Sequence, residues 1–248
     1  MVLQENNKLL SIIIPAYNEQ DNIHRTFNTI RQILNEAHIP FEILFVDDGS
    51  RDMTWPRICE LSAGLSEAKG ISFSRNFGKE SAIFAGLESA SGACCVIMDC
   101  DLQHPPAVIP EMYRLWQEGF EVVEGVKASR GQENPFHTFC AKGFYKIISR
   151  VTKVNMSDAS DFKLLDRKAV DALLLLPERA PFFRALSSWV GFRTASVPFE
   201  VQERAIGSSK WSMWSLVKYA IRNITSYTGA PMQVVTLIRR LMLLDSDI

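Results

Sequence analysis

The sequence predicts an α/β domain with a mostly parallel sheet flanked by helices. Three observations support this fold class. Short apolar runs rich in β-branched residues alternate with segments whose apolar residues recur at helical spacing, the connections between them are short, and polar residues gather where the apolar runs end. Because crossovers between parallel strands are right-handed, helices should cover both faces of the sheet.

The first half of the chain predicts four strand and helix units and a fifth strand. Residues 10–15 form a β-branched run closed by Pro15, which is typical of a buried strand entering a turn. The helix that follows has apolar residues at helical spacing, namely Ile23, Phe27, Ile30 and Leu34. The pattern repeats, with strands expected over 41–46, 70–73, 93–98 and 120–124 and helices over 54–65, 79–89 and 107–116.

The second half changes pattern after Gly125. Helices are expected over 135–151 and 167–176, and strands over 162–165 and 197–201. No internal repeat or low-complexity linker separates the two halves. We therefore expect one compact domain over 1–210, followed by an amphipathic segment over 211–248.

Composition excludes several functional classes. The chain has 248 residues, of which 47% are hydrophobic and 22% charged, as in ordinary globular proteins. A net charge of −1 argues against a generally basic nucleic-acid binder. The five cysteines show neither a CxxC nor a metal-ligand spacing, which favours a reducing cytoplasm. No stretch reaches the roughly 20 apolar residues of a spanning helix.

Familiar nucleotide and hydrolase motifs are missing from the sequence. It contains no GxGxxG and no P-loop, so a Rossmann dinucleotide site or a nucleotide triphosphatase has no motif support. None of the four histidines lies near a serine or cysteine in a nucleophile motif. His104 follows an Asp-x-Asp sequence, and we expect it to face water in a loop.

The polar residues at the predicted strand ends are the candidate site. In parallel sheets ligands bind outside the carboxyl ends of the strands. Asp99 and Asp101 are two residues apart, so strand alternation would point both side chains the same way. Hard cations such as Mg²⁺ or Mn²⁺ would relieve their repulsion, and Gln103 adds a neutral oxygen. The alternative, a solvated turn before two prolines, is less favoured at this rim.

Three other strand ends allow two interpretations each. Asp47 and Asp48 suit either a turn with a helix cap or carboxylates that bind a ribose or base, and the two are equally favoured. Pro15, Tyr17 and Glu19 would frame a base or ribose. In the alternative interpretation, Pro15 simply stops the strand and Glu19 is an acid favoured at the start of a helix. Lys79 follows a glycine at the predicted start of a helix, which suits an anion site or a solvated charge.

Together these motifs resemble the inverting glycosyltransferase family 2 of GT-A (Rossmann-like) fold. The resemblance is carried by residues 11–19 (Ser-Ile-Ile-Ile-Pro-Ala-Tyr-Asn-Glu), 46–50 (Val-Asp-Asp-Gly-Ser) and 99–103 (Asp-Cys-Asp-Leu-Gln). Segments 75–79, 160–167 and 204–211 are more narrowly similar to polyprenyl-phosphate glycosyltransferases, a group with bactoprenol glucosyltransferases and dolichyl-phosphate mannose synthases. The resemblance extends over roughly residues 9–235.

The resemblance implies a substrate set and residue roles. It implies a nucleotide-sugar donor such as UDP-glucose, Mg²⁺ or Mn²⁺, a polyprenyl phosphate acceptor such as undecaprenyl phosphate, and a role in cell-envelope polysaccharide synthesis. The implied donor-binding residues are Pro15, Tyr17, Glu19, Asp47, Asp48, Lys79, Asp99, Cys100, Lys127, Arg204 and Lys210. The implied catalytic residues are Asp99, Asp101, Asp161, Arg204 and Lys210, and the metal ligands are Asp99, Asp101 and Gln103. Lys127 stands at a position that is often arginine in the family. A lysine keeps the positive charge but cannot bind a phosphate through two parallel N–H groups as arginine does.

The acceptor decides whether a base is needed. A lipid phosphate, with a second pKa near 6, is largely ionised at neutral pH and needs no strong base. A sugar hydroxyl would need a carboxylate such as Asp161. One alternative is a family 2 enzyme acting on a hydroxyl of a cell-surface polysaccharide. Another is an inactive nucleotide-sugar binder, against which the intact Asp99, Asp101, Arg204 and Lys210 argue.

The last part of the chain predicts contact with a membrane surface. Residues 204–240 contain six cations and no acid, interleaved with aromatic residues. This pattern is typical of an interfacial amphipathic helix, although a helix packed on the core is the alternative. Relatives often continue into membrane-spanning helices, so we expect this chain to lack that anchor and to bind the cytoplasmic face of the membrane peripherally. The sequence leaves open a homo-oligomer.

Overall fold

The computed structural model describes residues 8–128, 160–176, 183–189, 191–200 and 236. The chain divides into two compact units, one of residues 1–132 with 158–208 and one of 133–157 with 209–248. Every strand and helix below belongs to the first unit. The helix expected over 135–151 and nearly all of 211–248 lie outside the described residues, so both stay predictions.

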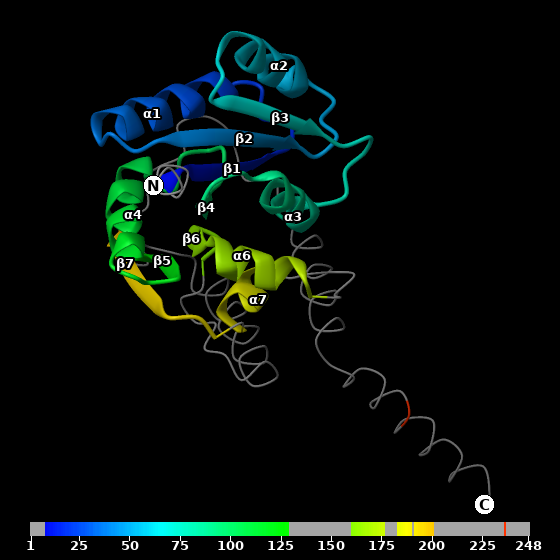
Figure 1. Ribbon diagram of the computed structural model, residues 1–248. Coiled ribbons are helices and arrows are strands. Elements are labelled where there is room, and N and C mark those ends of the chain that lie inside the picture. Colours follow the sequence, from blue (N-terminus) through cyan, green and yellow to red (C-terminus); the bar gives the residue numbers. More distant parts are fainter. Residues whose placement is uncertain (1–7, 129–159, 177–182, 190, 201–235, 237–248) are drawn as a thin grey trace, which may run out of the picture. The chain divides into compact units, whose positions relative to one another are not determined.

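Within the described residues, seven strands form one sheet in the order β3-β2-β1-β4-β6-β5-β7. In Figure 1 the sheet runs from β3, beside α2, to β7 at the opposite edge. Only β6 among these strands runs against its neighbours. The strands are β1 (Leu10–Ala16), β2 (Phe41–Asp47), β3 (Ala68–Ser72), β4 (Cys94–Ile97), β5 (Val122–Lys127), β6 (Lys163–Asp166) and β7 (Thr194–Phe199).

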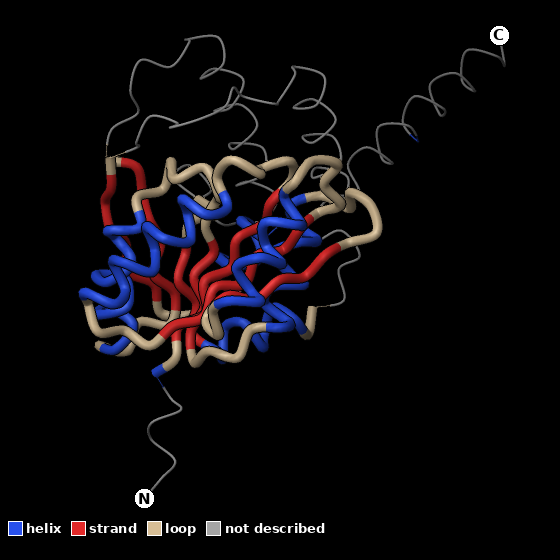
Figure 2. The backbone as a smooth tube through the Cα atoms, turned by 90° about the horizontal axis from the view of Figure 1, so that it is seen from above, coloured by secondary structure: helices blue, strands red, loops and turns tan. Residues whose placement is uncertain are grey.

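Helices connect the parallel strands and cover the sheet on both faces, as expected (Figure 2). They are α1 (Ile23–Glu36), α2 (Thr54–Gly64), α3 (Lys79–Ser89), the short 3-10 helix η2 (Pro106–Val108), α4 (Ile109–Gln117), α6 (Arg167–Leu174) and α7 (Phe183–Trp189). In Figure 2 the loops after the carboxyl ends of the parallel strands gather along the upper edge of the sheet.

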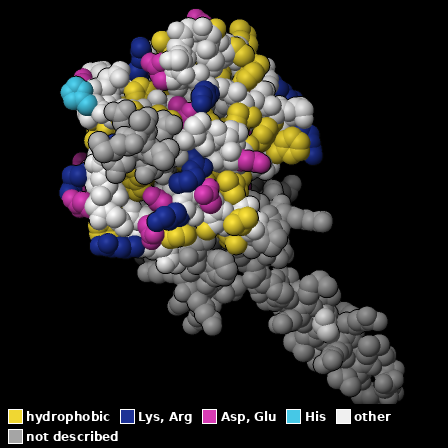
Figure 3. Space-filling view, viewed as in Figure 1, with side chains coloured by type: hydrophobic (Ala, Val, Ile, Leu, Met, Phe, Trp, Pro, Cys, Tyr) yellow, Lys and Arg dark blue, Asp and Glu magenta, His cyan; other side chains and the backbone are white. Residues whose placement is uncertain are grey.

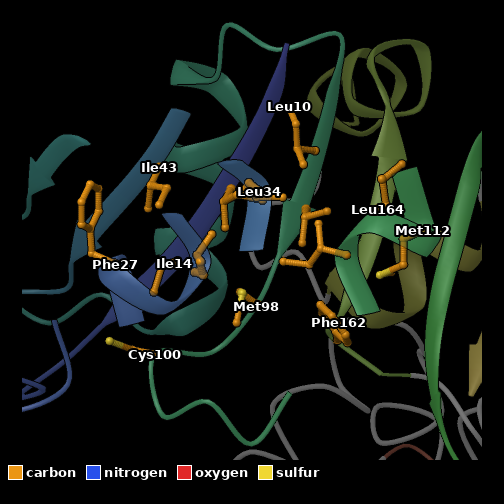
Figure 4. Packing of buried hydrophobic residues seen from close by; sticks show 14 of the residues in the cluster. Leu10, Ile14, Phe27, Leu34, Ile43, Met98, Cys100, Met112, Phe162 and Leu164 are labelled. Atoms are coloured by element: carbon orange, nitrogen blue, oxygen red, sulfur yellow. The ribbon is translucent and has the colours of Figure 1, made fainter. Parts of the chain in front are cut away.

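The core lies in two layers because strand side chains alternate between the faces. Ile12 and Ile14 of β1 belong to a large cluster that includes the apolar faces of α1, α2 and α4. Figure 4 shows part of this layer, with Phe27 and Leu34 from α1 and Met112 from α4. Ile13 faces the other way, against Gly86 of α3, where an added Cβ would lie 2.4 Å from Ile13 Cγ2.

Most element boundaries agree with the predictions to within a few residues. Helix α3 has the expected bounds, whereas β7 begins and ends earlier than the strand predicted over 197–201. Helix α7 was not predicted, because its seven residues are too few to show helical periodicity.

The surface of the described unit agrees with a near-neutral chain. Acidic and basic side chains are interspersed on the face drawn in Figure 3. Among the described residues, none of the helices combines the length and the apolar character needed to cross a membrane.

Candidate active site

The loops after β1 and β2 are joined by hydrogen bonds at the carboxyl edge of the sheet. The Asn18 amide N–H donates to Ser50 Oγ (2.9 Å), and the Arg51 N–H donates to Asn18 Oδ1 (2.9 Å). The Glu19 N–H donates to Thr54 Oγ1 (2.8 Å) at the start of α2. Asn18 adopts a positive φ of 54°, a conformation that asparagine tolerates better than most residues. The two predicted nucleoside-binding loops therefore form one unit.

Asp47 and Asp48 are buried, and their carboxylates accept hydrogen bonds from nearby backbone N–H groups. Asp47 Oδ1 accepts from the Ser50 N–H (3.1 Å), as the turn interpretation requires. Asp48 accepts from the Phe77 N–H (2.7 Å) and the Gly78 N–H (2.9 Å), just before α3. Burial raises the pKa of Asp48 despite these hydrogen bonds. The Phe77 and Gly78 N–H groups just before this helix are thus already bound by the protein's own carboxylate, whereas an anion site at Lys79 itself stays a prediction.

Gly49 lies against the loop that precedes α3. A Cβ at this position would lie 2.4 Å from the Arg75 backbone carbon, and the glycine has a positive φ of 68°. No side chain fits this close approach. The turn after β2 is consequently packed directly on the backbone that leads to Lys79.

Three predicted site residues meet at the end of β4. Lys79 Nζ lies 2.5 Å from Asp99 Oδ1 and 3.0 Å from Asp161 Oδ2. On its other side, Asp161 accepts hydrogen bonds from Arg184 Nε at Oδ1 (3.0 Å) and from Arg184 Nη2 at Oδ2 (2.9 Å). The four side chains form a row of alternating charge, from Asp99 through Lys79 and Asp161 to Arg184.

The direction of β6 explains why Asp161 lies at this edge. Ile97 at the end of β4 pairs with Lys163 at the start of β6, because the two strands are antiparallel. The residues just before β6 therefore lie beside those just after β4. An antiparallel strand inserted in a parallel sheet brings Asp161 to the carboxyl edge.

Charge pairing sets the protonation of this row. Burial by itself would raise the pKa of both aspartates, but Lys79 next to Asp99, and Arg184 with Lys79 next to Asp161, outweigh it and hold both pKa values below the usual range. Burial would lower the pKa of Lys79, and the two carboxylates raise it instead. All four groups are therefore charged at neutral pH.

Glu80, the residue after Lys79, has a raised pKa, in contrast to the lowered pKa values of Asp99 and Asp161. Burial, with the nearby charge of Asp161, raises the pKa of Glu80 to about 7. Its Oε2 accepts a hydrogen bond from the Phe183 N–H (2.8 Å) at the start of α7. Glu80 is thus the carboxyl group beside the row that changes charge near neutral pH.

Asp101 and Gln103 follow the strand in a turn rather than continuing it. Strand β4 ends at Ile97, and Leu102 has a positive φ of 59°. The Gln103 N–H donates to Asp101 Oδ1 (3.1 Å). The expectation that strand alternation aligns Asp99 with Asp101 is therefore wrong, since neither belongs to the strand.

Asp99, Asp101 and Gln103 carry the types of oxygen donor that a divalent cation bound to a diphosphate uses. Within the described ranges, no group of three or more His, Cys, Asp or Glu side chains is arranged to hold a metal. Mg²⁺ sites with substrate phosphates, however, commonly use only one or two carboxylates. Asp99, Asp101 and Gln103 supply oxygen donors of that kind, and the Asp99 side chain is 35% exposed.

Other predicted residues lie in different surroundings. The Cys100 thiol is buried in the core, 3.9 Å from Thr26 Oγ1, so a donor contact would have to come from its backbone. Tyr17 is 38% exposed at the end of β1. Pro15 pairs with Val46 inside the sheet, and Lys127 is exposed at the end of β5. Arg204 and Lys210 lie outside the described residues.

Two further side chains, Lys163 and His104, pack near this edge of the sheet. Lys163 is fully buried, with its Nζ 2.6 Å from Glu124 Oε1 and 2.9 Å from Ser187 Oγ of α7. The His104 ring stacks on Phe162 with centroids 5.1 Å apart. His104 is therefore packed on an aromatic ring and does not simply face water, because the turn after Asp101 folds back over the sheet.

Sequence reasoning did not identify Arg184, Glu80 or the support from Lys163. Glu80 directly follows the 75–79 motif, and Lys163 lies within the 160–167 segment. Both residues could therefore have been identified from these motifs. Arg184 stands in no motif, and its place follows only from the packing of α7.

Comparisons with known proteins agree with this fold. The chain is 40% identical over 228 residues to an uncharacterized glycosyltransferase of Synechocystis sp., covering 92% of this chain and 72% of that protein. It is 36% identical over 230 residues to the bactoprenol glucosyl transferase of Shigella phage SfV, covering 92% and 75%.

Solved structures show the same fold at low identity. Glucosyl-3-phosphoglycerate synthase from Mycobacterium tuberculosis, in complex with Mn²⁺, UDP and phosphoglyceric acid, has a TM-score of 0.60 at 19% identity, over 88% of this chain and 77% of that one. The model for "Glycosyl transferase family 2" matches residues 11–174. The chain therefore belongs to glycosyl transferase family 2 and is a glycosyltransferase with a GT-A fold.

Proposed function

We propose that the enzyme transfers glucose with inversion from UDP-glucose to a polyprenyl phosphate such as undecaprenyl phosphate. The observation that carries this proposal is the pairing of Asp161 with both Lys79 and Arg184. A carboxylate with so low a pKa is a poor general base, because proton transfer to it is strongly uphill at neutral pH. An acceptor that arrives already ionised needs no such base.

Relatives support this acceptor and this sugar. Bactoprenol glucosyl transferases of Shigella phages SfV, SfII and SfX are 35–36% identical to the chain over 92% of its length. The mycobacterial synthase with the same fold was solved with Mn²⁺ and UDP-glucose, at a TM-score of 0.57. A glucosyl donor and a lipid carrier are thus the substrates that similarity favours.

Donor binding would use the joined loops at the carboxyl edge. The nucleoside would lie against Tyr17 and Asp47, near Pro15, Glu19 and Asp48, with Lys79, Lys127, Arg204 and Lys210 toward the phosphates. Asp99, Asp101 and Gln103 would hold Mg²⁺ or Mn²⁺. When bound, such a cation neutralises charge developing on the departing diphosphate.

Residues of this chain would then orient an in-line attack. Lys79 contacts both Asp99 and Asp161, and Arg184 fixes the Asp161 carboxylate. A phosphate oxygen of the acceptor attacks the anomeric carbon of glucose, the bond to the diphosphate breaks, and UDP leaves with the bonding electron pair. The acceptor phosphate oxygen is largely deprotonated, so no proton has to be removed first.

The enzyme would meet its acceptor at a membrane surface. Residues 211–240 are rich in cations and aromatic residues, a composition suited to anionic headgroups. Flotation with anionic liposomes at low and high salt tests this part. Binding at low salt that weakens at high salt is expected, and no binding at low salt would contradict it.

A second candidate acceptor, a sugar hydroxyl, is favoured by one observation. Glu80, with a pKa of about 7, is ionised in a useful fraction at neutral pH and could accept a proton. However, its carboxylate already accepts the Phe183 N–H. Glu80→Gln separates the two candidates, because it would abolish transfer to a hydroxyl and spare transfer to a phosphate.

The direct test supplies labelled UDP-glucose, Mg²⁺ or Mn²⁺ and a short polyprenyl phosphate. We expect label in the organic phase that depends on the protein and on the cation. Other labelled nucleotide sugars serve as matched donors and should give less product. Transfer of the label to a soluble saccharide with release of UDP, and no labelled lipid from any donor, would favour the second candidate.

A further inference from the structure

We infer that Lys79 is an internal counter-cation of Asp99 that must leave this carboxylate before a divalent cation binds. The inference rests on the proposed metal site. It adds a specific role to Lys79: nucleotide binding draws the ammonium away and thereby opens the metal site. Metal and nucleotide binding would be coupled through this one side chain.

The geometry places the ammonium where it competes with a metal. Lys79 Nζ lies 2.5 Å from Asp99 Oδ1, a distance typical of a strong charge-assisted hydrogen bond. A divalent cation on the same carboxylate would lie about 2.1 Å from its oxygen. Two cations so close to one oxygen repel each other strongly, because Coulomb energy varies inversely with distance.

Lys79 is not enclosed on every side, because its side chain is 33% exposed. Leaving Asp99 breaks an ion pair, so a new anion has to replace that partner. Asp161 is only 11% exposed, and a buried carboxylate without a partner would be costly. Arg184, however, donates to both oxygens of Asp161 and would keep it paired after Lys79 departs.

A diphosphate supplies the reason for Lys79 to move. Lys79 is the first residue of α3, at the edge where the donor phosphates are proposed to bind. A bound diphosphate would offer the ammonium a new anion while the metal takes its place on Asp99. Linkage then requires that nucleotide and metal each raise the affinity for the other.

The test measures Mn²⁺ binding to the full chain, by the electron paramagnetic resonance signal of free Mn²⁺, with and without UDP. Without UDP, Lys79→Met should bind Mn²⁺ at least about tenfold more tightly than wild type, since a competing positive charge is gone. UDP should raise Mn²⁺ affinity by a smaller factor in this variant than in wild type. Equal or weaker Mn²⁺ binding by Lys79→Met would overturn the inference.

Lys69→Met is the matched control, because Lys69 Nζ also lies 2.5 Å from a carboxylate, Glu42 Oε2, near the starts of β3 and β2 at the opposite edge. It removes the same charge and should leave Mn²⁺ binding unchanged. If Lys79→Met loses its thermal unfolding transition, Lys79→Gln replaces it and is held to the same outcome.

Asp99→Asn separates failure of this inference from failure of the proposed site. If Asp99→Asn abolishes Mn²⁺ binding while Lys79→Met does not tighten it, only the role of Lys79 is wrong. If Asp99→Asn leaves Mn²⁺ binding intact, the metal lies elsewhere and the inference fails with the proposed site.

Discussion

Arg184 binds both carboxylate oxygens of Asp161, through Nε to Oδ1 at 3.0 Å and through Nη2 to Oδ2 at 2.9 Å. Such a bidentate pair fixes the plane of the carboxylate as well as its charge. Because Lys79 binds the same carboxylate, Asp161 is held as an anion that orients cations. This arrangement favours a positioning role for Asp161 over the role of a base.

Replacing Asp161 with Asn should weaken the fold as well as the activity. The change leaves the Arg184 guanidinium, 22% exposed, without its partner charge, and we expect a loss of about 2–4 kcal/mol in the free energy of unfolding. Urea denaturation measures this. Asp171→Asn is the control, since Asp171 is exposed and lies 3.9 Å from Arg167. Equal effects of the two changes would contradict the pairing described above.

Glu80 should make stability fall as the pH rises toward 8. Its native pKa of about 7 exceeds the ordinary value of 4.5, so between these pH values the native state binds more protons than the unfolded state. Stability therefore declines with rising pH across this window. Glu80→Gln should remove on the order of 2 kcal/mol of this decline between pH 5 and pH 8, measured by urea denaturation.

The control for Glu80 is Glu36→Gln on the exposed face of α1, where Glu36 accepts a hydrogen bond from Gln32. This variant should follow the wild-type pH dependence. Parallel curves for Glu80→Gln and wild type would show that Glu80 ionises at an ordinary pH.

Asp101→Asn should reduce metal-dependent turnover by about a hundredfold or more, because a metal ligand that stabilises developing charge is lost. Its thermal unfolding should stay near that of wild type, since Asn still accepts the Gln103 N–H. Asp21→Asn, an exposed carboxylate before α1, is the control for both measurements. Unchanged turnover in Asp101→Asn would refute the metal assignment.

Gly49→Ala should destabilise the edge that carries the donor loops. The added Cβ would meet the Arg75 backbone at 2.4 Å and occupy a positive φ, which together should cost about 2–3 kcal/mol of unfolding free energy. UDP affinity, measured by calorimetry, should fall with it. Gly64→Ala is the control, because a Cβ there meets nothing within 4 Å. Similar stability of the two variants would contradict the close packing of the turn.

Local patterns were enough to predict the first half of the fold. The alternation of apolar runs and helical periodicity predicted β1 to β5 in order, and it placed Lys79 and Asp99 at one edge of the sheet. The structure then brings these two residues into contact as an ion pair. The apolar period did not reveal that β4 ends at Ile97, where the turn to Gln103 begins.

Long-range geometry was beyond the sequence. Asp161 entered the site by family resemblance, because residue order does not reveal that β6 is antiparallel and inserted between β4 and β5. Arg184 was not predicted, since its contact depends on how short α7 packs against β6. The charge row therefore required tertiary structure.

The central claim, transfer to an ionised lipid phosphate without a base, is tested by one comparison of acceptors. The rate of label transfer from UDP-glucose is measured for a short polyprenyl phosphate and for the polyprenol of the same length. We predict transfer to the phosphate only, with a rate that is not abolished by Glu80→Gln. Transfer to the polyprenol at a similar rate, or none to the phosphate while a saccharide hydroxyl is glucosylated, would contradict it.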